Sequence, residues 1–178
     1  MNQIKYQLRF FLPIWFINIL TCWLPDNKFS IKIRGFLVSI FLPGCPKNLT
    51  LGRDVTLLGV DNLIIGDDVY IAKGGWFNGK GGITIEDEVV FAPYCVVVST
   101  AHGFKENSVR WGGTHFKPVS IGKGTWVASH CTIASGTTIG KGCLIGANSM
   151  VNGFFEDNSF LGGVPAKFIK IRQNNPGI

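Results

Sequence analysis

The sequence has few charged residues, few histidines and no metal-ligand spacing among its cysteines. Charged residues make up 16% of the 178 residues and hydrophobic residues 46%, which is enough apolar surface for a core and excludes a disordered chain. None of the five cysteines stands in a CxxC pair, so we expect no metal site. Their odd number, without secretory features, indicates a reducing compartment and predicts a cytoplasmic protein. The 23 glycines follow no Gly-X-Y period, which excludes collagen and indicates many tight turns.

Acidic residues are nearly absent from both ends of the chain. Residues 1–50 contain Asp26 as their only acid beside six basic residues, and the stretch from Gly163 onward contains three basic residues and no acid. The middle of the chain is almost neutral. Two basic ends do not form the continuous basic stripe of a nucleic-acid-binding protein. We therefore expect a local anionic contact at each end and no nucleic-acid partner.

The N-terminal segment, residues 1–48, carries an apolar run that is too short to cross a membrane. The run FFLPIWFINILTCWLP at 10–25 has no signal-peptide cleavage site after it and falls short of the ~20 residues that a spanning helix needs. We expect two helical pieces at 3–24 and 29–42, joined by the turn PDNK.

Two interpretations of this segment remain open. It packs against the rest of the chain or a neighbouring subunit, or Trp15, Phe16 and Trp23 enter a membrane interface while lysine and arginine contact the lipid head groups. In the second case the protein lies peripherally on the inner face of the cytoplasmic membrane.

Aliphatic residues recur every six positions through most of the remaining chain. The clearest run consists of Ile121, Val127, Ile133, Ile139, Ile145 and Val151. A helix repeats at 3.6 and a half-buried strand at 2, so neither produces this period. Three hexapeptides make one triangular coil of about eighteen residues, and the coils stack at the ~4.8 Å spacing of strands. The sequence thus predicts an all-β domain, a parallel β-helix at 49–170, followed by a tail at 171–178.

The small residues of each hexad and the break in the rhythm carry further information. Cys95, Cys131 and Cys143 occupy the same small-residue position as threonines elsewhere, so we interpret them as buried fillers and not as nucleophiles or disulfide partners. The rhythm stops at His102 and returns only at Val119. The loop between them, 103–118, is long for a compact domain, which is often a sign of function.

The hexad run and three longer stretches together resemble a known family. IEDEVVFAPYCVVVSTAH, SIGKGTWVASHCTIASGTTIG and GGVPAKFIKI match the hexapeptide-repeat acyltransferases with a left-handed β-helix. The closest likeness is to the galactoside, maltose and nodulation-factor acetyltransferases and to O-acetyltransferases of capsule and lipopolysaccharide assembly. The resemblance implies a left-handed helix, a homotrimer with sites between subunits, and acetyl-CoA as co-substrate. It also places His102 at the catalytic histidine, a general base at neutral pH.

The resemblance assigns further positions to the two substrates. Residues that line the family's pantetheine groove correspond to Trp126, Ser129, Ala147 and Asn152. Basic positions near the nucleotide phosphates correspond to Lys167 and Lys170, where the family often has arginine, so the charge is kept and the bidentate geometry is lost. Candidates for the acceptor side are Asn78, Trp111 and His115.

Ordinary interpretations compete with these assignments. His115 and His130 also fit a surface or subunit contact. A γ-class carbonic anhydrase shares the fold and binds zinc through histidines, two of which stand five residues apart, whereas the separations here are 13 and 15, so zinc is not expected.

We expect an acetyl-CoA-dependent O-acetyltransferase acting on a sugar hydroxyl in bacterial surface polysaccharide biosynthesis, of capsule, O-antigen or exopolysaccharide. The alternatives are another small acceptor, such as an amino sugar, an antibiotic or serine, and a non-catalytic β-helix scaffold subunit.

Overall fold

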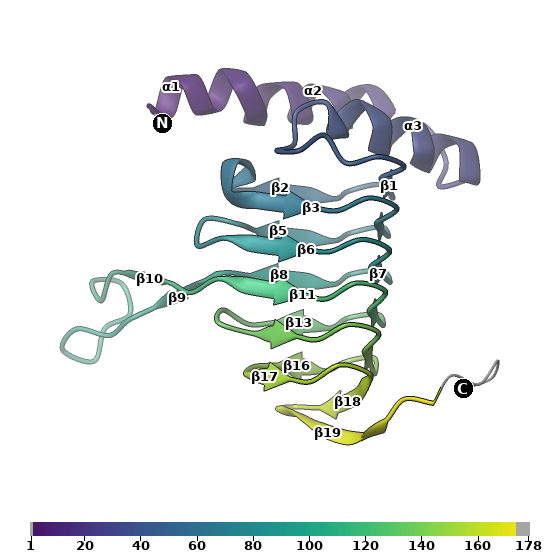
Figure 1. Cartoon of the computed structure of the whole chain (residues 1–178). Helices are drawn as coiled ribbons and strands as arrows, with labels where there is room; N and C mark the ends of the chain where they lie inside the picture. Colours follow the sequence, from purple (N-terminus) through teal and green to yellow (C-terminus); the bar gives the residue numbers. More distant parts are fainter. Residues whose placement is uncertain (1, 174–178) are drawn as a thin grey trace.

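The computed structural model describes residues 2–173, a stack of β-coils with helices across its N-terminal end (Figure 1). Of the tail predicted at 171–178, residues 174–178 lie outside the described part. The helices are α1 (Gln3–Tyr6), the π-helical turn η1 (Gln7–Phe11), α2 (Leu12–Thr21) and α3 (Lys28–Ser39). The first helical piece, expected at 3–24, thus ends at Thr21, three residues earlier than predicted. No helix in the described part has the length and hydropathy that crossing a bilayer requires.

Each coil passes through three parallel sheets in turn. The first sheet contains β1 (Thr50–Leu51), β4 (Tyr70–Ile71), β7 (Val90–Phe91), β12 (Trp126–Val127), β15 (Leu144–Ile145) and β18 (Ser159–Gly163), with β19 (Ala166–Ile171) antiparallel at its edge. The second contains β2 (Thr56–Leu58), β5 (Trp76–Asn78), β8 (Val96–Val98), β13 (Thr132–Ile133) and β16 (Met150–Val151). The third contains β3 (Leu63–Ile65), β6 (Ile83–Ile85), β11 (Val119–Ile121), β14 (Thr138–Ile139) and β17 (Phe154–Phe155).

The aliphatic residues that recur every six positions form the core of this stack. All six residues of the clearest run are exposed by 1% or less. Equivalent residues of successive coils pair in register, so that Phe91, Val127 and Ile145 form one column. The small residue after each of them allows the coils to approach closely. A Cβ on Gly52, for example, would lie 2.3 Å from the backbone nitrogen of Lys73 in the next coil.

The three cysteines of the hexads are buried, as predicted. Each thiol donates a hydrogen bond to a backbone carbonyl oxygen of the next coil, at 3.1 to 3.2 Å. Burial raises the pKa of all three thiols, that of Cys95 to about 12. A thiol that stays protonated is a poor nucleophile, so these side chains act as core packing.

Insertions gather at the corner between the second and third sheets. The first two coils are 20 residues long, since Thr50 pairs with Tyr70 and Tyr70 with Val90. In the first coil the extra residues include η2 (Val60–Asn62). One coil after β5, the chain leaves the same corner as a long arm (Figure 1). The arm begins with a two-stranded ribbon of β9 (Thr100–His102) and β10 (Thr114–Phe116), so part of the predicted loop 103–118 is a β-strand.

Candidate active site

His102 stands on one face of the arm and His115 on the other. In the ribbon, His102 lies opposite Thr114, Ala101 opposite His115, and Thr100 opposite Phe116. Directly opposed side chains share a face and successive ones alternate. One face therefore carries His102 together with Thr100 and Phe116, whereas the His115 ring turns to the other side, with Nε2 beside Gly103.

The root of the arm is fixed to the preceding coil. The Ser99 backbone N–H and hydroxyl both donate to the Asn78 carbonyl oxygen, at 3.0 and 2.7 Å. The Ser99 carbonyl oxygen accepts from the Lys117 N–H at 3.0 Å, which joins the two ends of the arm. Ser99 is fully buried. These bonds hold His102 at a defined height on the stack, although the arm itself is exposed.

Asn78, the acceptor-side candidate, lies beside the face that carries His102. Its side-chain nitrogen donates to the Thr100 hydroxyl at 3.3 Å, and its side-chain oxygen accepts from the Lys80 N–H at 3.3 Å. Thr100 is two residues from His102 on the same face of the ribbon. The structure thus brings Asn78 and His102 to one side of the arm, linked through Thr100.

The imidazole of His102 is free to receive a hydroxyl in the single chain. The side chain is exposed and forms no hydrogen bond or ion pair with the described residues. A general base must have one ring nitrogen available within hydrogen-bond reach of the proton that it removes. Trp111, the second loop candidate, lies farther out on the arm, 72% exposed, with the Arg110 guanidinium 5.7 Å from its ring centroid.

A hollow of about 470 Å³ lies between the arm root and the N-terminal helix, where it is lined by Tyr6, Phe11, Gly59, Lys80 and Phe116, among others. The Tyr6 hydroxyl accepts from the Gly59 N–H at 2.9 Å, which ties the helix to the corner. Phe116 lines this hollow and lies on the same face of the arm as His102. That face is therefore directed toward the hollow. The sequence pattern had not pointed to Tyr6 or Phe116.

Three of the residues assigned to the pantetheine groove lie along one side of the stack. Trp126, 41% exposed, begins β12 of the first sheet. Ser129 and Ala147 follow at the corner between the first and second sheets, on successive coils, where the Asn148 N–H donates to the Ser129 carbonyl oxygen at 3.0 Å. Asn152 lies at the opposite end of the second sheet, after β16. One chain therefore does not bring all four together.

Lys167 and Lys170 stand on β19, exposed, at the C-terminal edge of the first sheet. Lys170 pairs in register with Phe160, and its ammonium lies 5.9 Å from the Phe160 ring centroid. Phe160 in turn pairs with Leu144, and Leu144 with Trp126. The two lysines thus lie below Trp126 on the same sheet, which is consistent with one extended ligand.

The base and most of the groove residues occupy different corners of one chain. His102 projects from the corner between the second and third sheets, whereas Ser129 and Ala147 lie at the corner between the first and second. The whole second sheet separates them (Figure 1). A single chain therefore holds both halves of the predicted site but does not join them.

His130 lies away from the arm. It is exposed at a corner with φ of 59°, and its ring packs against Tyr94 with centroids 5.2 Å apart. Within the described residues no group of three or more His, Cys, Asp or Glu side chains is placed to hold a metal ion.

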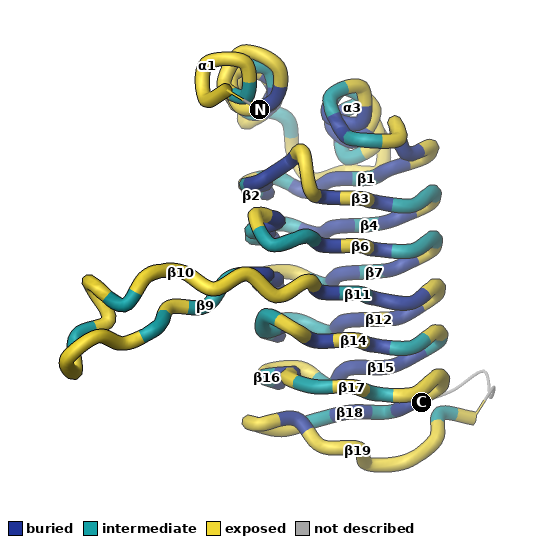
Figure 2. The backbone as a smooth tube through the Cα atoms, turned by 60° about the vertical axis from the view of Figure 1, so that its left-hand side comes forward, coloured by how far each residue is buried: buried dark blue, intermediate teal, exposed yellow. Residues whose placement is uncertain are grey.

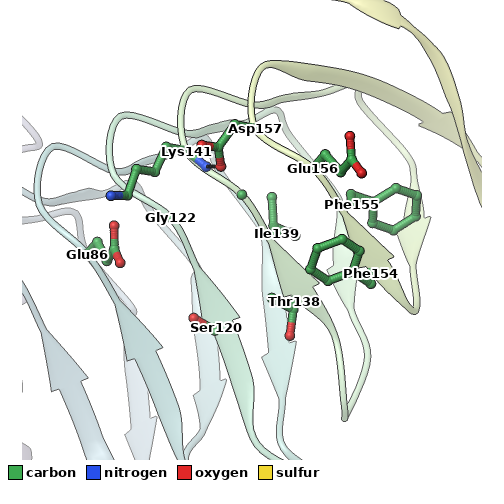
Figure 3. A pocket seen from close by; sticks show the side chains of 11 residues that line it. Glu86, Ser120, Gly122, Thr138, Ile139, Lys141, Phe154, Phe155, Glu156 and Asp157 are labelled. Atoms are coloured by element: carbon green, nitrogen blue, oxygen red, sulfur yellow. Dashed lines mark hydrogen bonds between the residues drawn. The ribbon is translucent and has the colours of Figure 1, made fainter.

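Figure 3 shows a second hollow, of about 540 Å³, on the outer face of the third sheet. Its lining includes Ser120, Thr138, Phe154, Glu86, Lys141 and Asp157. Two of the carboxylates accept hydrogen bonds from the backbone of neighbouring coils. Asp157 accepts from the Lys141 N–H at 2.7 Å, and Glu86 accepts from the Lys123 N–H at 2.9 Å. None of the predicted site residues lines this hollow, so we assign it no chemistry.

Comparison with known proteins identifies the hexapeptide repeats of this chain. The family described as "Bacterial transferase hexapeptide (six repeats)" matches residues 118–153. The chain therefore carries the hexapeptide repeats of this family. One relative is a protein of Escherichia coli K12 named as the lipopolysaccharide biosynthesis O-acetyl transferase WbbJ, which is 31% identical over 128 residues, in an alignment that covers 67% of this chain. The chain covers 62% of that relative's length.

Solved structures of this family have the same fold. A maltose O-acetyltransferase from Clostridium difficile superposes with a TM-score of 0.81 at 20% identity, covering 97% of this chain and 90% of that one. A hexapeptide-repeat acetyltransferase from Vibrio cholerae, complexed with acetyl coenzyme A, gives 0.72 at 19% identity, covering 97% and 91%. The predicted fold, a left-handed parallel β-helix with helices at its N-terminal end, is thereby confirmed.

Proposed function

We propose that this chain is an O-acetyltransferase that moves acetyl from acetyl-CoA to a sugar hydroxyl, with His102 as general base. The observation that carries the proposal is the anchored arm, which presents an exposed imidazole on the same face as Thr100, the residue that Asn78 contacts. The WbbJ relative, named for lipopolysaccharide O-acetylation, and the Vibrio cholerae structure with acetyl coenzyme A support the reaction class. The name of the WbbJ relative also supports a bacterial surface polysaccharide as the acceptor.

The chemistry needs one base and a positioned thioester. The imidazole accepts the sugar hydroxyl's proton as the oxygen attacks the acetyl carbonyl carbon. The tetrahedral intermediate then collapses, the carbon–sulfur bond breaks, and the proton passes from the imidazolium to the departing CoA sulfur. Holding both substrates in one cleft supplies much of the remaining acceleration. Asn78 orients the acceptor by hydrogen bonds at the arm root.

The working unit in this proposal is a homotrimer with each site between two chains. It rests on the separation of His102 from Ser129 and Ala147 within one chain, because a neighbour must supply the missing half. In a cyclic assembly every chain meets its neighbour through the same pair of surfaces, so three equal sites form. Trp126, Ser129, Ala147 and Asn152 are then the groove residues, while Lys167 and Lys170 bind the nucleotide phosphates of acetyl-CoA.

The test measures binding and transfer separately. Titration calorimetry with CoA should show saturable binding, and labelled acetyl-CoA should acetylate at least one member of a panel of hexoses, amino sugars and nucleotide sugars. An alkali-labile product is an ester, whereas an alkali-stable product is an amide and would move the reaction to an amine acceptor. A chain that binds no CoA at all would be a scaffold, and the proposed function would be wrong.

A further inference from the structure

The N-terminal helix turns a row of large apolar side chains away from the protein. Its inner side, with Phe10, Ile14 and Ile17, is buried against the coils. Its outer side is exposed (Figure 2). We call this outer side, together with Trp23 in the turn that follows the helix, the N-terminal apolar surface. It consists of Ile4, Leu8, Phe11, Leu12, Trp15, Phe16, Ile19, Leu20 and Trp23.

The N-terminal apolar surface is larger than a soluble domain normally leaves uncovered. Its members are between 39% and 84% exposed, with Trp23 the most exposed. Together they present on the order of 1,000 Å², against the ~300–600 Å² of the largest apolar patch on a typical monomer. Leaving this much apolar area in water is unfavourable at ~25 cal/mol per Å², so a partner must cover it.

The charges around the surface identify the partner as anionic. Lys5 and Arg9 lie on the first helix, with Lys28 and Lys32 on α3, and none of the four forms an ion pair with the described residues. Asp26, the one acid of the helical segment, is already paired: its carboxylate lies 3.0 Å from the Arg34 guanidinium and accepts from the Arg53 N–H. Asp61 lines a hollow with Arg9, and Asp68 lines one with Lys32, but neither carboxylate forms an ion pair with the described residues. The four cations therefore outnumber the two nearby acids that could balance them.

We propose that the N-terminal apolar surface lies in the interface of a bilayer that contains anionic lipids. Trp and Phe side chains enter the head-group and acyl boundary while Lys and Arg contact lipid phosphates, as in other interfacial helices. A second copy of the surface fits less well, because it would bring equal positive charges together. The helix that carries the surface lies across the end of the stack, so neighbouring chains can still approach the sides of the coils (Figure 2).

This placement gives the proposed reaction an orientation, and that part rests on the proposed function. The hollow beside the arm root is walled by Gln3, Tyr6, Gln7 and Phe11 of the same helix. A bilayer on the outer side of this helix therefore lies close to the hollow, and to the face of the arm that carries His102. An acceptor sugar linked to a lipid at the membrane surface can reach that hollow without leaving its membrane.

The experiment measures lipid binding with the full chain. The protein is sedimented with vesicles of phosphatidylcholine alone and of phosphatidylcholine mixed with phosphatidylglycerol, and tryptophan fluorescence is quenched with brominated lipids. One variant combines Trp15→Ser, Phe16→Ser and Trp23→Ser; a second combines Lys5→Gln and Arg9→Gln. The matched controls change side chains remote from the helix, namely Phe154→Ser for apolar area and Lys123→Gln with Lys141→Gln for charge.

The wild type and both controls should bind the mixed vesicles, more weakly at high salt, and show quenching. The triple variant should lose at least about tenfold in partition coefficient. The charge variant should lose about tenfold on mixed vesicles and little on phosphatidylcholine. Circular dichroism establishes that the variants remain folded.

Wild-type protein that neither sediments nor is quenched would overturn the proposal. So would a triple variant that binds as the wild type does, or one whose only change is a smaller assembly in solution, which would make the surface a contact between copies. Acetyl transfer to a soluble sugar is measured without vesicles, so failure of membrane binding and failure of the proposed function are distinguishable.

Discussion

Two inactive chains should restore each other's activity if each site is built from two subunits. The first variant is His102→Ala, which removes the base but keeps the groove. The second is Ala147→Trp, which places an indole over the corner shared with Ser129 and blocks the groove but keeps the base. Because one chain holds these residues at different corners, an intact base on one chain must act on a groove of its neighbour.

The recovery follows from the symmetry. When equal amounts of the two variants assemble at random in a cyclic trimer, a site works only if the arm comes from the Ala147→Trp chain and the groove from the His102→Ala chain. That combination occurs at about one site in four, so co-expression should give about 25% of wild-type activity. Each variant alone should give a small fraction of this.

The assay is steady-state acetyl transfer, with native mass spectrometry to verify mixed assemblies. The matched control pairs His102→Ala with a chain that carries both substitutions, and it should show no recovery. Mixed trimers that remain inactive in the main experiment would refute the shared site, because base and groove would then belong to the same chain.

Three further predictions concern single groups. Lys167→Ala with Lys170→Ala should raise the KM for acetyl-CoA several-fold, less so at high salt because screening already weakens the phosphate contact; Lys141→Ala, outside the predicted site, should leave the KM unchanged. Asn78→Ala should lower kcat about tenfold, because it removes the side chain that orients the acceptor and its hydrogen bond to Thr100 at the arm root. The KM for acetyl-CoA should stay unchanged, and an unaltered kcat would remove Asn78 from the site. The Cys95 thiol, whose pKa burial raises from 9.0 to about 12, should resist alkylation in the folded protein. Because folding holds its proton, the free energy of unfolding should fall as pH rises from about 9 toward 12, and a pH-independent free energy there would contradict this.

The fold could be predicted from the sequence because each hexad repeats one physical requirement. Residues such as Ile121 and Val127 must point into a narrow prism, and the small residue that follows, such as Gly122, must allow the next coil to approach. Neither a helix nor an ordinary strand repeats every six residues, so this period indicates the β-helix alone. The same logic predicted the buried cysteines correctly.

The geometry of the site could not be predicted in this way. The assignment of His102 and His115 to opposite faces depends on the register between β9 and β10, and no periodicity inside 103–118 specifies that register. The link from Asn78 to Thr100 joins residues 22 positions apart. The hollow at Tyr6 and Phe116 arises only when the N-terminal helix packs across the corner. The roles of the predicted site residues remain predictions.

The most direct test of the central claim is the turnover of His102→Ala with a sugar acceptor. If the imidazole is the general base, turnover should fall by ~10²–10⁴-fold, while CoA affinity and assembly stay near wild type. His115→Ala, on the other face of the arm, and His130→Ala, against Tyr94, should each cost much less. A His102→Ala protein that transfers acetyl to sugar at nearly the wild-type rate would contradict the mechanism.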